Sequence, residues 1–200
     1  MRAYRALAAL LSYPTPGLVA ALPEIRGAVS GADGLLAELA AEPLVRLEER
    51  YVALFDRSRA LSLHLFEHVH GESRERGQAM VDLQAMYEAR GLTTVAHELP
   101  DYIPAFFEYL SLLEPDEARA LVADAAQVLR ALGERLAQCG SRYAEVFAVA
   151  LALAGEAGLA RKARSAPAPE DLDAQWMDPQ VTFGTPSVAP VRLYRNGVPA

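Results

Sequence analysis

The sequence predicts an all-α protein: a single bundle of about eight or nine helices, followed by an extended, proline-rich C-terminal tail. Three observations support this fold class. Apolar residues recur at the helical period over most of residues 1–160, helix-starting and helix-ending residues separate these stretches, and no stretch shows the strict alternation of a half-buried strand. With 200 residues, of which 52% are hydrophobic, the chain is long enough to bury one sizeable core.

The first helices are expected to be short, near residues 2–12, 16–28 and 33–40. The next helix, 44-LVRLEERYVALF-55, has a clearer pattern, and Pro43 suits its first turn. Its apolar side chains fall on one stripe: Leu44, Leu47, Tyr51, Leu54 and Phe55. Charged residues occupy the rest, so we expect one face of this helix to pack on the core.

Two helices are expected in the middle of the chain. Ser73 is suited to cap the first, and Gly91 is suited to end it in the left-handed conformation. The inward residues of this helix are expected to be Met80, Leu83 and Tyr87. Asp101 is suited to cap the second helix, 102-YIPAFFEYLSLL-113.

Two longer helices are expected to complete the bundle. One begins at Pro115, with Asp116 and Glu117 in its first turn, where the helix dipole favours negative charge. After a break at Gly140, the stretch 142-RYAEVFAVALALAG-155 is so apolar that we expect it to run through the core.

The chain changes character after residue 160. Residues 161–200 hold six of the thirteen prolines and show no sustained helical stripe, which predicts an extended tail next to a helical domain of residues 1–160. Trp176 and 181-VTFG-184 are apolar enough to dock on the bundle or on a partner. A fully solvated tail is equally compatible with the composition.

Composition excludes several classes of protein. The net charge of −7 argues against nucleic-acid binding, which needs a basic surface, and favours basic partners. The single cysteine, Cys139, excludes an internal disulfide or a multi-cysteine metal site and fits a reducing compartment. The longest apolar run, Val146 to Ala154, is short for a membrane span, and the N-terminal residues lack a signal-peptide pattern. We therefore expect a cytoplasmic protein.

The stretch 64-HLFEHVHGESRERGQ-78 concentrates three of the four histidines. His64, Glu67 and His68 form an H-x-x-E-H pattern, which on a helix would place both histidines on one face, as in inverted zinc proteases. Such an enzyme also needs a third ligand and an open coordination position. The alternative is that these side chains form local hydrogen bonds.

The stretch from Gly91 to Ala118 is acidic throughout. It carries six carboxylates and no Lys or Arg: Glu98, Asp101, Glu108, Glu114, Asp116 and Glu117. Helix capping and solvation explain such a run without any partner. The functional alternative is an apolar groove with an acidic rim that receives a basic, amphipathic peptide helix.

Four segments carry a resemblance to a known family. The run 65-LFEHVHGESRERGQAMVDL-83, followed by 97-HELPDYIPAFFEYL-110, closely resembles the NarJ branch of the TorD/DmsD family of molybdoenzyme assembly chaperones. The segments 48-EERYVALFD-56 and 178-DPQVTFG-184 are similar to further motifs of that branch. The wider family has Glu-x-Pro-Asp-His where this chain has 98-ELPDY-102, and the NarJ branch is similar in carrying Tyr there.

The resemblance implies a cytoplasmic, all-helical chaperone without catalytic activity. It would bind the N-terminal segment of the apo catalytic subunit of respiratory nitrate reductase and keep that subunit competent for molybdenum cofactor insertion and membrane docking. It implies no stably bound cofactor and no metal site. The candidate partner-binding residues are Glu67, His68, His70, Arg74, Arg76, Glu98, Pro100, Asp101, Tyr102 and Glu108. A zinc-dependent hydrolase and an unrelated helical adaptor are the alternative functions.

Overall fold

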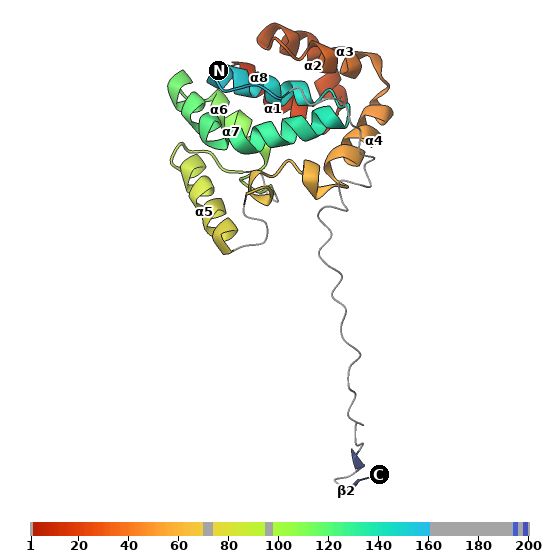
Figure 1. Ribbon diagram of the computed structural model, residues 1–200, viewed down its shortest axis with the longest axis vertical. Coiled ribbons are helices and arrows are strands. Elements are labelled where there is room, and N and C mark those ends of the chain that lie inside the picture. Colours follow the sequence, from red (N-terminus) through yellow and green to blue (C-terminus); the bar gives the residue numbers. More distant parts are fainter. Residues whose placement is uncertain (1, 70–73, 95–97, 161–193, 196–197, 200) are drawn as a thin grey trace.

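The computed structural model describes residues 2–69, 74–94, 98–160, 194–195 and 198–199. Within them the chain forms eight α-helices and two short 3₁₀ helices (Figure 1). The α-helices are α1 (Arg2–Leu11), α2 (Pro16–Ala28), α3 (Asp33–Ala41), α4 (Leu44–Phe55), α5 (Arg74–Glu88), α6 (Ile103–Ser111), α7 (Pro115–Gln138) and α8 (Ala144–Ala154). The 3₁₀ helices span Arg59–Leu61 and Leu65–Glu67. The predicted all-α class is confirmed.

The predicted tail lies mostly outside the described residues. Its described part consists of β1 (Tyr194–Arg195) and β2 (Val198–Pro199), which pair antiparallel. Trp176 and 181-VTFG-184 fall outside the described part of the chain, as does Ser73, the expected cap of α5. The domain boundary near residue 160 therefore stays a prediction.

The helix ends follow the local sequence. The Thr15 hydroxyl accepts a hydrogen bond from Leu18 N at 3.1 Å and caps α2, whose first residue is Pro16. Gly91 and Gly155 adopt φ values of 72° and 77° beyond the ends of α5 and α8. Residues with a side chain are strained in this left-handed conformation. The predicted stop at Gly91 is confirmed, and Gly155 ends α8 in the same way.

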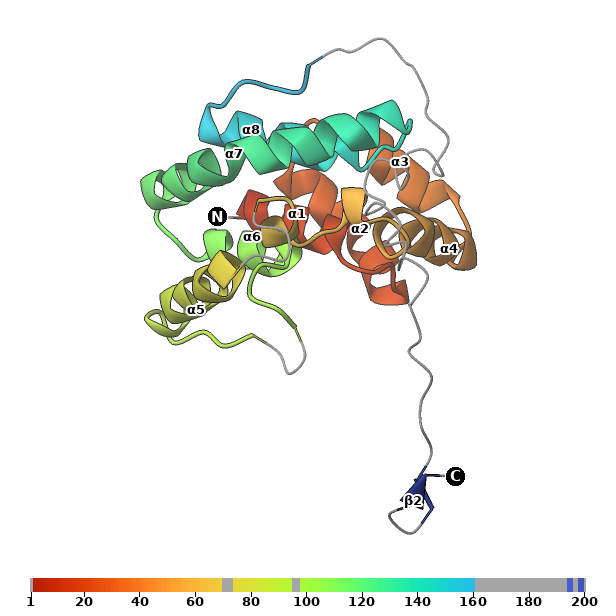
Figure 2. The same ribbon diagram turned by 60° about the horizontal axis from the view of Figure 1, so that its bottom comes forward.

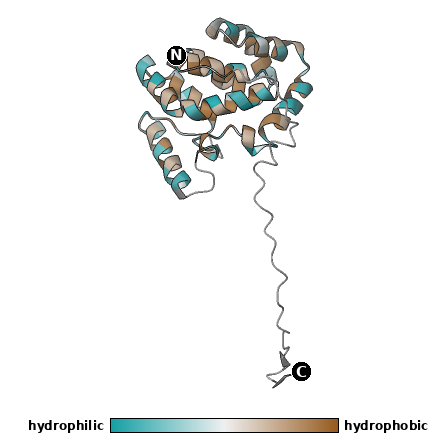
Figure 3. Ribbon diagram, viewed as in Figure 1, coloured by the Kyte–Doolittle hydropathy of each residue, from teal (hydrophilic) through white to brown (hydrophobic). Residues whose placement is uncertain are grey.

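The core is centred on α1, which packs against α6, α8 and α2. Its Tyr4, Leu7, Leu10 and Leu11 have no exposed surface. Helices α7 and α8 form a second layer over it (Figure 2), and the expected burial of the apolar helix α8 is confirmed by Val146, Phe147 and its other inward residues. Figure 3 shows the strongly apolar segments among these inner helices and hydrophilic residues on the outer faces.

Helix α5 stands apart from the main bundle (Figures 1 and 2). Among its described side chains, Leu83 and Tyr87 are the buried ones. The Tyr87 hydroxyl donates to Pro100 O at 2.9 Å, and its ring contacts Tyr109 of α6 with centroids 4.8 Å apart. One aromatic residue thus fastens the end of α5 to the loop that precedes α6.

A residue of α8 caps α3. The backbone N–H of Leu35 donates to Glu145 Oε2 at 3.0 Å, whereas the N-cap residue Ala32 offers no side-chain acceptor. A Cβ at Gly34 would lie 2.2 Å from Glu145 Oε1, so the close approach requires glycine there. The long-range bond therefore joins the α2–α3 pair to the core.

We expect Glu145→Ala to lower the free energy of unfolding by about 1 kcal/mol, because it removes this cap. Urea denaturation measures the loss. Arg142→Ala is the matched control, since its ion pair with Glu145 at 3.3 Å is largely exposed and should contribute less than about 0.5 kcal/mol. Equal losses in both variants would contradict the capping role.

No helix in the described part of the chain is both long enough and apolar enough to cross a membrane.

Candidate functional site: an acidic groove between α1 and α6

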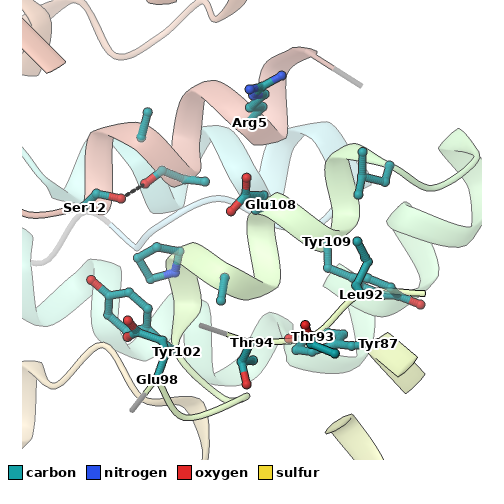
Figure 4. A pocket seen from close by; sticks show the side chains of 15 residues that line it. Arg5, Ser12, Tyr87, Leu92, Thr93, Thr94, Glu98, Tyr102, Glu108 and Tyr109 are labelled. Carbon is teal, nitrogen blue, oxygen red and sulfur yellow. Dashed lines mark hydrogen bonds between the residues drawn. The ribbon is translucent and has the colours of Figure 1, made fainter. Parts of the chain in front are cut away.

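A groove of about 490 Å³ opens between α1, α6 and the loop that follows α5. The two helices run in opposite directions along it: α1 from Arg5 to Ser12, and α6 from the Tyr102 end past Glu108 to Tyr109 (Figure 4). The volume lies in the range of ligand sites but is too small for a whole helix. It suits the apolar face of a helix laid along the opening.

Small side chains keep the groove open. Helix α1 lines it at helical spacing with Arg5, Ala8, Ala9 and Ser12, and the Ser12 hydroxyl is satisfied by Ala8 O at 2.9 Å. Helix α6 contributes Pro104, Ala105, Glu108, Tyr109 and Leu112 from its matching face. Because alanine predominates where the helices meet, the surface is hollow there, and Leu112 at 63% exposure offers apolar contact at the rim.

The rim of the groove carries unpaired charge. Glu98 and Glu108 are exposed carboxylates that line it, and Arg5 is an exposed cation on the α1 side. None of the three forms an ion pair with a residue in the described ranges. A cationic ligand would therefore form ion pairs with both carboxylates without displacing a partner among the described residues.

Asp101 lies behind the groove and is completely buried. Its Oδ1 accepts a hydrogen bond from His64 Nδ1 at 3.0 Å, and its Oδ2 accepts one from Phe66 N at 3.1 Å. The predicted N-cap role is wrong: Tyr102 is the N-cap of α6, with no side-chain cap bond. The carboxylate instead satisfies donors of the 62–68 loop, which would otherwise be left without partners in the interior.

Backbone pairing joins the same two loops. Leu65 N donates to Asp101 O at 3.0 Å, and Ile103 N donates to Leu63 O at 2.8 Å. A single antiparallel bridge pairs His64 with Tyr102. The loop that carries 98-ELPDY-102 is thus held on one side by the histidine segment and on the other by Tyr87.

Tyr102 connects this loop to the core and to the groove. Its hydroxyl donates to the Tyr51 hydroxyl at 3.2 Å, and Tyr51 in turn donates to Leu11 O of α1 at 2.9 Å. Its ring lines the groove and lies 5.5 Å from the His64 ring. A displacement of Tyr102 in the groove would therefore also displace His64, whose ring it contacts, and Asp101, which precedes it in the chain.

The two described histidines of the cluster have opposite electrostatic surroundings. The hydrogen bond to Asp101 raises the pKa of His64 above its ordinary value. Burial lowers the pKa of His68, whose Nε2 donates to Ser62 O at 2.8 Å while Nδ1 accepts from Arg135 at 3.4 Å. The imidazole of His68 therefore stays neutral to lower pH than an ordinary histidine, whereas His64 keeps its proton to higher pH.

The structure divides the candidate residues into two groups. Glu98, Tyr102 and Glu108 line the groove, while Pro100 and Asp101 position the loop. Glu67, His68 and Arg76 lie in a separate cluster, where Arg76 pairs with Glu67 at 3.6 Å. Arg74 begins α5, its side chain is not described, and His70 falls outside the described residues.

Sequence patterns did not single out Arg5, Ser12, Thr93 or Thr94, which also line the groove. The sequence feature that could have indicated this wall of the groove is the excess of alanine on one face of α1, a helix that otherwise buries leucine and tyrosine.

The geometry required by the zinc hydrolase alternative is not met. The two histidines do not share a helix face, because only Leu65–Glu67 form a 3₁₀ turn, with His64 before it and His68 at its end. Each ring bonds to a different partner. Within the described residues, no group of three or more His, Cys, Asp or Glu side chains is placed to hold a metal ion.

A second hollow, of about 470 Å³, lies between α8 and the turn after α2. It is lined by small and apolar residues, among them Val29, Gly31, Val149 and Leu153, and no charged side chain lines it. Of these two hollows, the α1–α6 groove is the one that combines an apolar floor with charges that have no ion-pair partner among the described residues.

An apolar, charge-rimmed groove on a helical bundle is a surface on which an amphipathic peptide helix could lie. Sequence comparison identifies the family. The profile of the nitrate reductase delta subunit family matches residues 13–149, and the chain belongs to that family.

Three curated relatives support the assignment. The chain is 49% identical over 144 residues to the nitrate reductase molybdenum cofactor assembly chaperone NarJ of Escherichia coli K12, covering 68% of this chain and 61% of that protein. It is 43% identical over 148 residues to the probable chaperone NarW of the same organism, covering 70% and 64%. It is 32% identical over 161 residues to the probable NarJ of Bacillus subtilis 168, covering 74% and 86%. The chain thus spans less than two thirds of the length of the two E. coli relatives.

Proposed function

We propose that this chain is an assembly chaperone of respiratory nitrate reductase that works in the cytoplasm and catalyses no reaction. It binds the N-terminal segment of the apo catalytic subunit as an amphipathic, cationic helix. That contact keeps the subunit competent for insertion of the molybdenum cofactor, which is the cargo of the client and is not stably held by the chaperone, and for membrane docking.

The observation that carries the proposal is the α1–α6 groove with its unpaired carboxylates. Apolar side chains of a helical peptide fit between Ala8, Ala105 and Leu112, and its Lys or Arg side chains reach Glu98 and Glu108. The names of the relatives support the identity of the client. Membership in the nitrate reductase delta subunit family argues against the alternative function of a helical adaptor in an unrelated pathway.

The second cluster is proposed as a further contact with the client. Glu67 and Arg76 are half-buried and paired, and His68 bonds Ser62 O and Arg135, so their first role is to hold the 62–68 loop against α5 and α7. His70 and Arg74 are proposed as partner-binding residues on the family resemblance alone. Asp101 and Pro100 are proposed to act through the positions of Tyr102 and Glu98.

A genetic experiment tests the chaperone role. A strain that lacks this gene should make nitrate reductase whose catalytic subunit contains little molybdenum, and the wild-type gene should restore it. The metal content of the purified subunit is the direct measurement. Fully loaded enzyme from the deletion strain would contradict the proposal.

We expect peptide affinity to depend on pH because His64 titrates beside the groove. Its charge interacts with Glu98, so the protonated imidazole offsets the carboxylate that attracts a cationic peptide. Affinity should rise about two- to threefold as the pH rises through the raised pKa of His64 and the imidazole loses its proton. Calorimetry with an N-acetylated peptide measures this rise without titration of the peptide's own amine.

His64→Gln is the control for that experiment. It should show a smaller change in affinity over the same pH range than the wild-type protein, since it lacks the imidazole whose charge interacts with Glu98. A flat profile in the wild-type protein would show that His64 does not act on the groove.

A further inference from the structure

The two ends of the groove differ in charge. At one end lie Ser12, Tyr102 and the carboxylate of Glu98 (Figure 4). Toward the other end lie Arg5 on the α1 side and Glu108 on the α6 side, whose opposite charges offset one another without forming an ion pair. The Glu98 end is therefore negative and the Arg5 end is close to neutral.

A bound helix has charged ends of its own. The unpaired N–H groups at its start carry partial positive charge, and the unpaired carbonyls at its end carry partial negative charge. A free α-amino group adds a full positive charge to the start of an N-terminal segment. These charges favour a carboxylate beside the first turn and a guanidinium beside the last.

On this basis we propose that the groove binds its helix in one direction, with the N-terminal end at Glu98 and Tyr102 and the C-terminal end toward Arg5. The proposal rests on the proposed peptide-binding function of the groove. It assigns to Arg5 a role that no sequence motif indicated, namely the choice between two orientations of the ligand.

The spacing of the charges suits such a choice. Arg5 and Ser12 lie seven residues apart on α1, which corresponds to about 10 Å along the helix axis, or about two turns of a bound helix. In the opposite orientation the terminal carbonyls would face the Glu98 carboxylate. The Glu98 end contributes roughly a two- to fivefold preference in exposed surroundings. Arg5 adds to the same preference because it offsets the Glu108 carboxylate, which would otherwise repel the terminal carbonyls.

Paramagnetic broadening in NMR spectra tests the direction. The protein carries Cys139→Ser, so that the label cannot exchange with its only thiol, and the helical client peptide carries one nitroxide at its N-terminal or its C-terminal end. We expect the N-terminal label to broaden the amide signals of Ser12 and Tyr102. The C-terminal label should broaden those of Arg5 and Leu112, and the reverse pattern, or equal broadening at both ends, would overturn the proposal.

A charge swap tests the cause of the direction. Arg5→Glu combined with Glu98→Arg leaves the net charge of the protein unchanged, so total attraction for the peptide is matched. We expect the broadening pattern to reverse in this variant, and an unchanged pattern would overturn the role of Arg5 and Glu98. Calorimetry on the same samples separates the two claims, because absence of binding contradicts the proposed function, whereas binding in the wrong direction contradicts only its orientation.

Discussion

Replacement of Asp101 by alanine is expected to lower the free energy of unfolding by about 2–4 kcal/mol. The carboxylate has no exposed surface, and its loss would leave Phe66 N and the His64 imidazole without their acceptor. The groove loop would also lose its tie to the histidine segment, so peptide affinity should fall together with stability. Urea denaturation followed by circular dichroism measures the stability loss.

Two further variants test whether the loss of stability comes from the buried carboxylate. Asp124→Ala is the matched control, because Asp124 is exposed in the middle of α7, and its change should stay within about 0.5 kcal/mol. Asp101→Asn keeps an acceptor of the same shape and should cost less than alanine. If Asp101→Ala is as stable as Asp124→Ala, the buried carboxylate does not hold the two loops together.

The pH dependence of Asp101→Asn has a defined sign. The pKa of His64 is raised in the folded protein, so the stabilisation from its bond to Asp101 is complete below the ordinary histidine pKa of about 6.5 and is lost as pH rises through the raised value. The stability gap between wild type and Asp101→Asn should therefore be larger at pH 6 than at pH 9. Burial lowers the pKa of His68, and the Asp101 charge partly opposes that lowering, so its loss in Asp101→Asn also favours a larger gap at low pH.

The second large effect is expected on peptide binding. Glu98→Lys combined with Glu108→Lys turns two attractive charges on the groove rim into repulsive ones. We expect the affinity for a cationic helical peptide to fall by about 10- to 100-fold, with less loss at high salt because the rim is exposed. Calorimetric titrations at low and high ionic strength measure both effects.

The control for this double variant changes charge elsewhere. Glu24→Lys combined with Asp124→Lys alters the net charge by the same amount on exposed faces of α2 and α7, away from the residues that line the groove. It should bind within about twofold of wild type, because the attraction comes from the rim and not from the overall charge. Similar losses in both double variants would mean that the groove is not the binding site.

Sequence periodicity predicted the helices well because their ends carry strong local signals. Thr15, Gly91, Pro115 and Gly155 all stand where a helix begins or ends in the structure. Residues 44–55, for which an apolar stripe predicted a helix, form α4, and Leu47, Tyr51 and Phe55 of that stripe are buried. Such features act within a few residues, so they are visible in a single sequence.

The site was less predictable because its contacts are long-range. His64 and Asp101 are separated by 37 residues, and no local pattern links them. Asp101 stands where a cap would stand, yet its carboxylate turns to the other loop, since burial there demands an acceptor for Phe66 N. Arg5 was not identified because an arginine in a short, mostly apolar helix indicates no site until α6 is placed beside it.

The most direct test of the central claim is a ¹H–¹⁵N NMR titration of the wild-type protein with the N-terminal peptide of its cognate nitrate reductase catalytic subunit. We predict saturable shifts that cluster on the groove, from Arg5 to Ser12 on α1, at Thr93 and Thr94, and from Tyr102 to Leu112 around α6. Shifts that cluster instead on the uncharged hollow beside α8, or no saturable shift at all, would contradict the assignment of the acidic groove as the client-binding site.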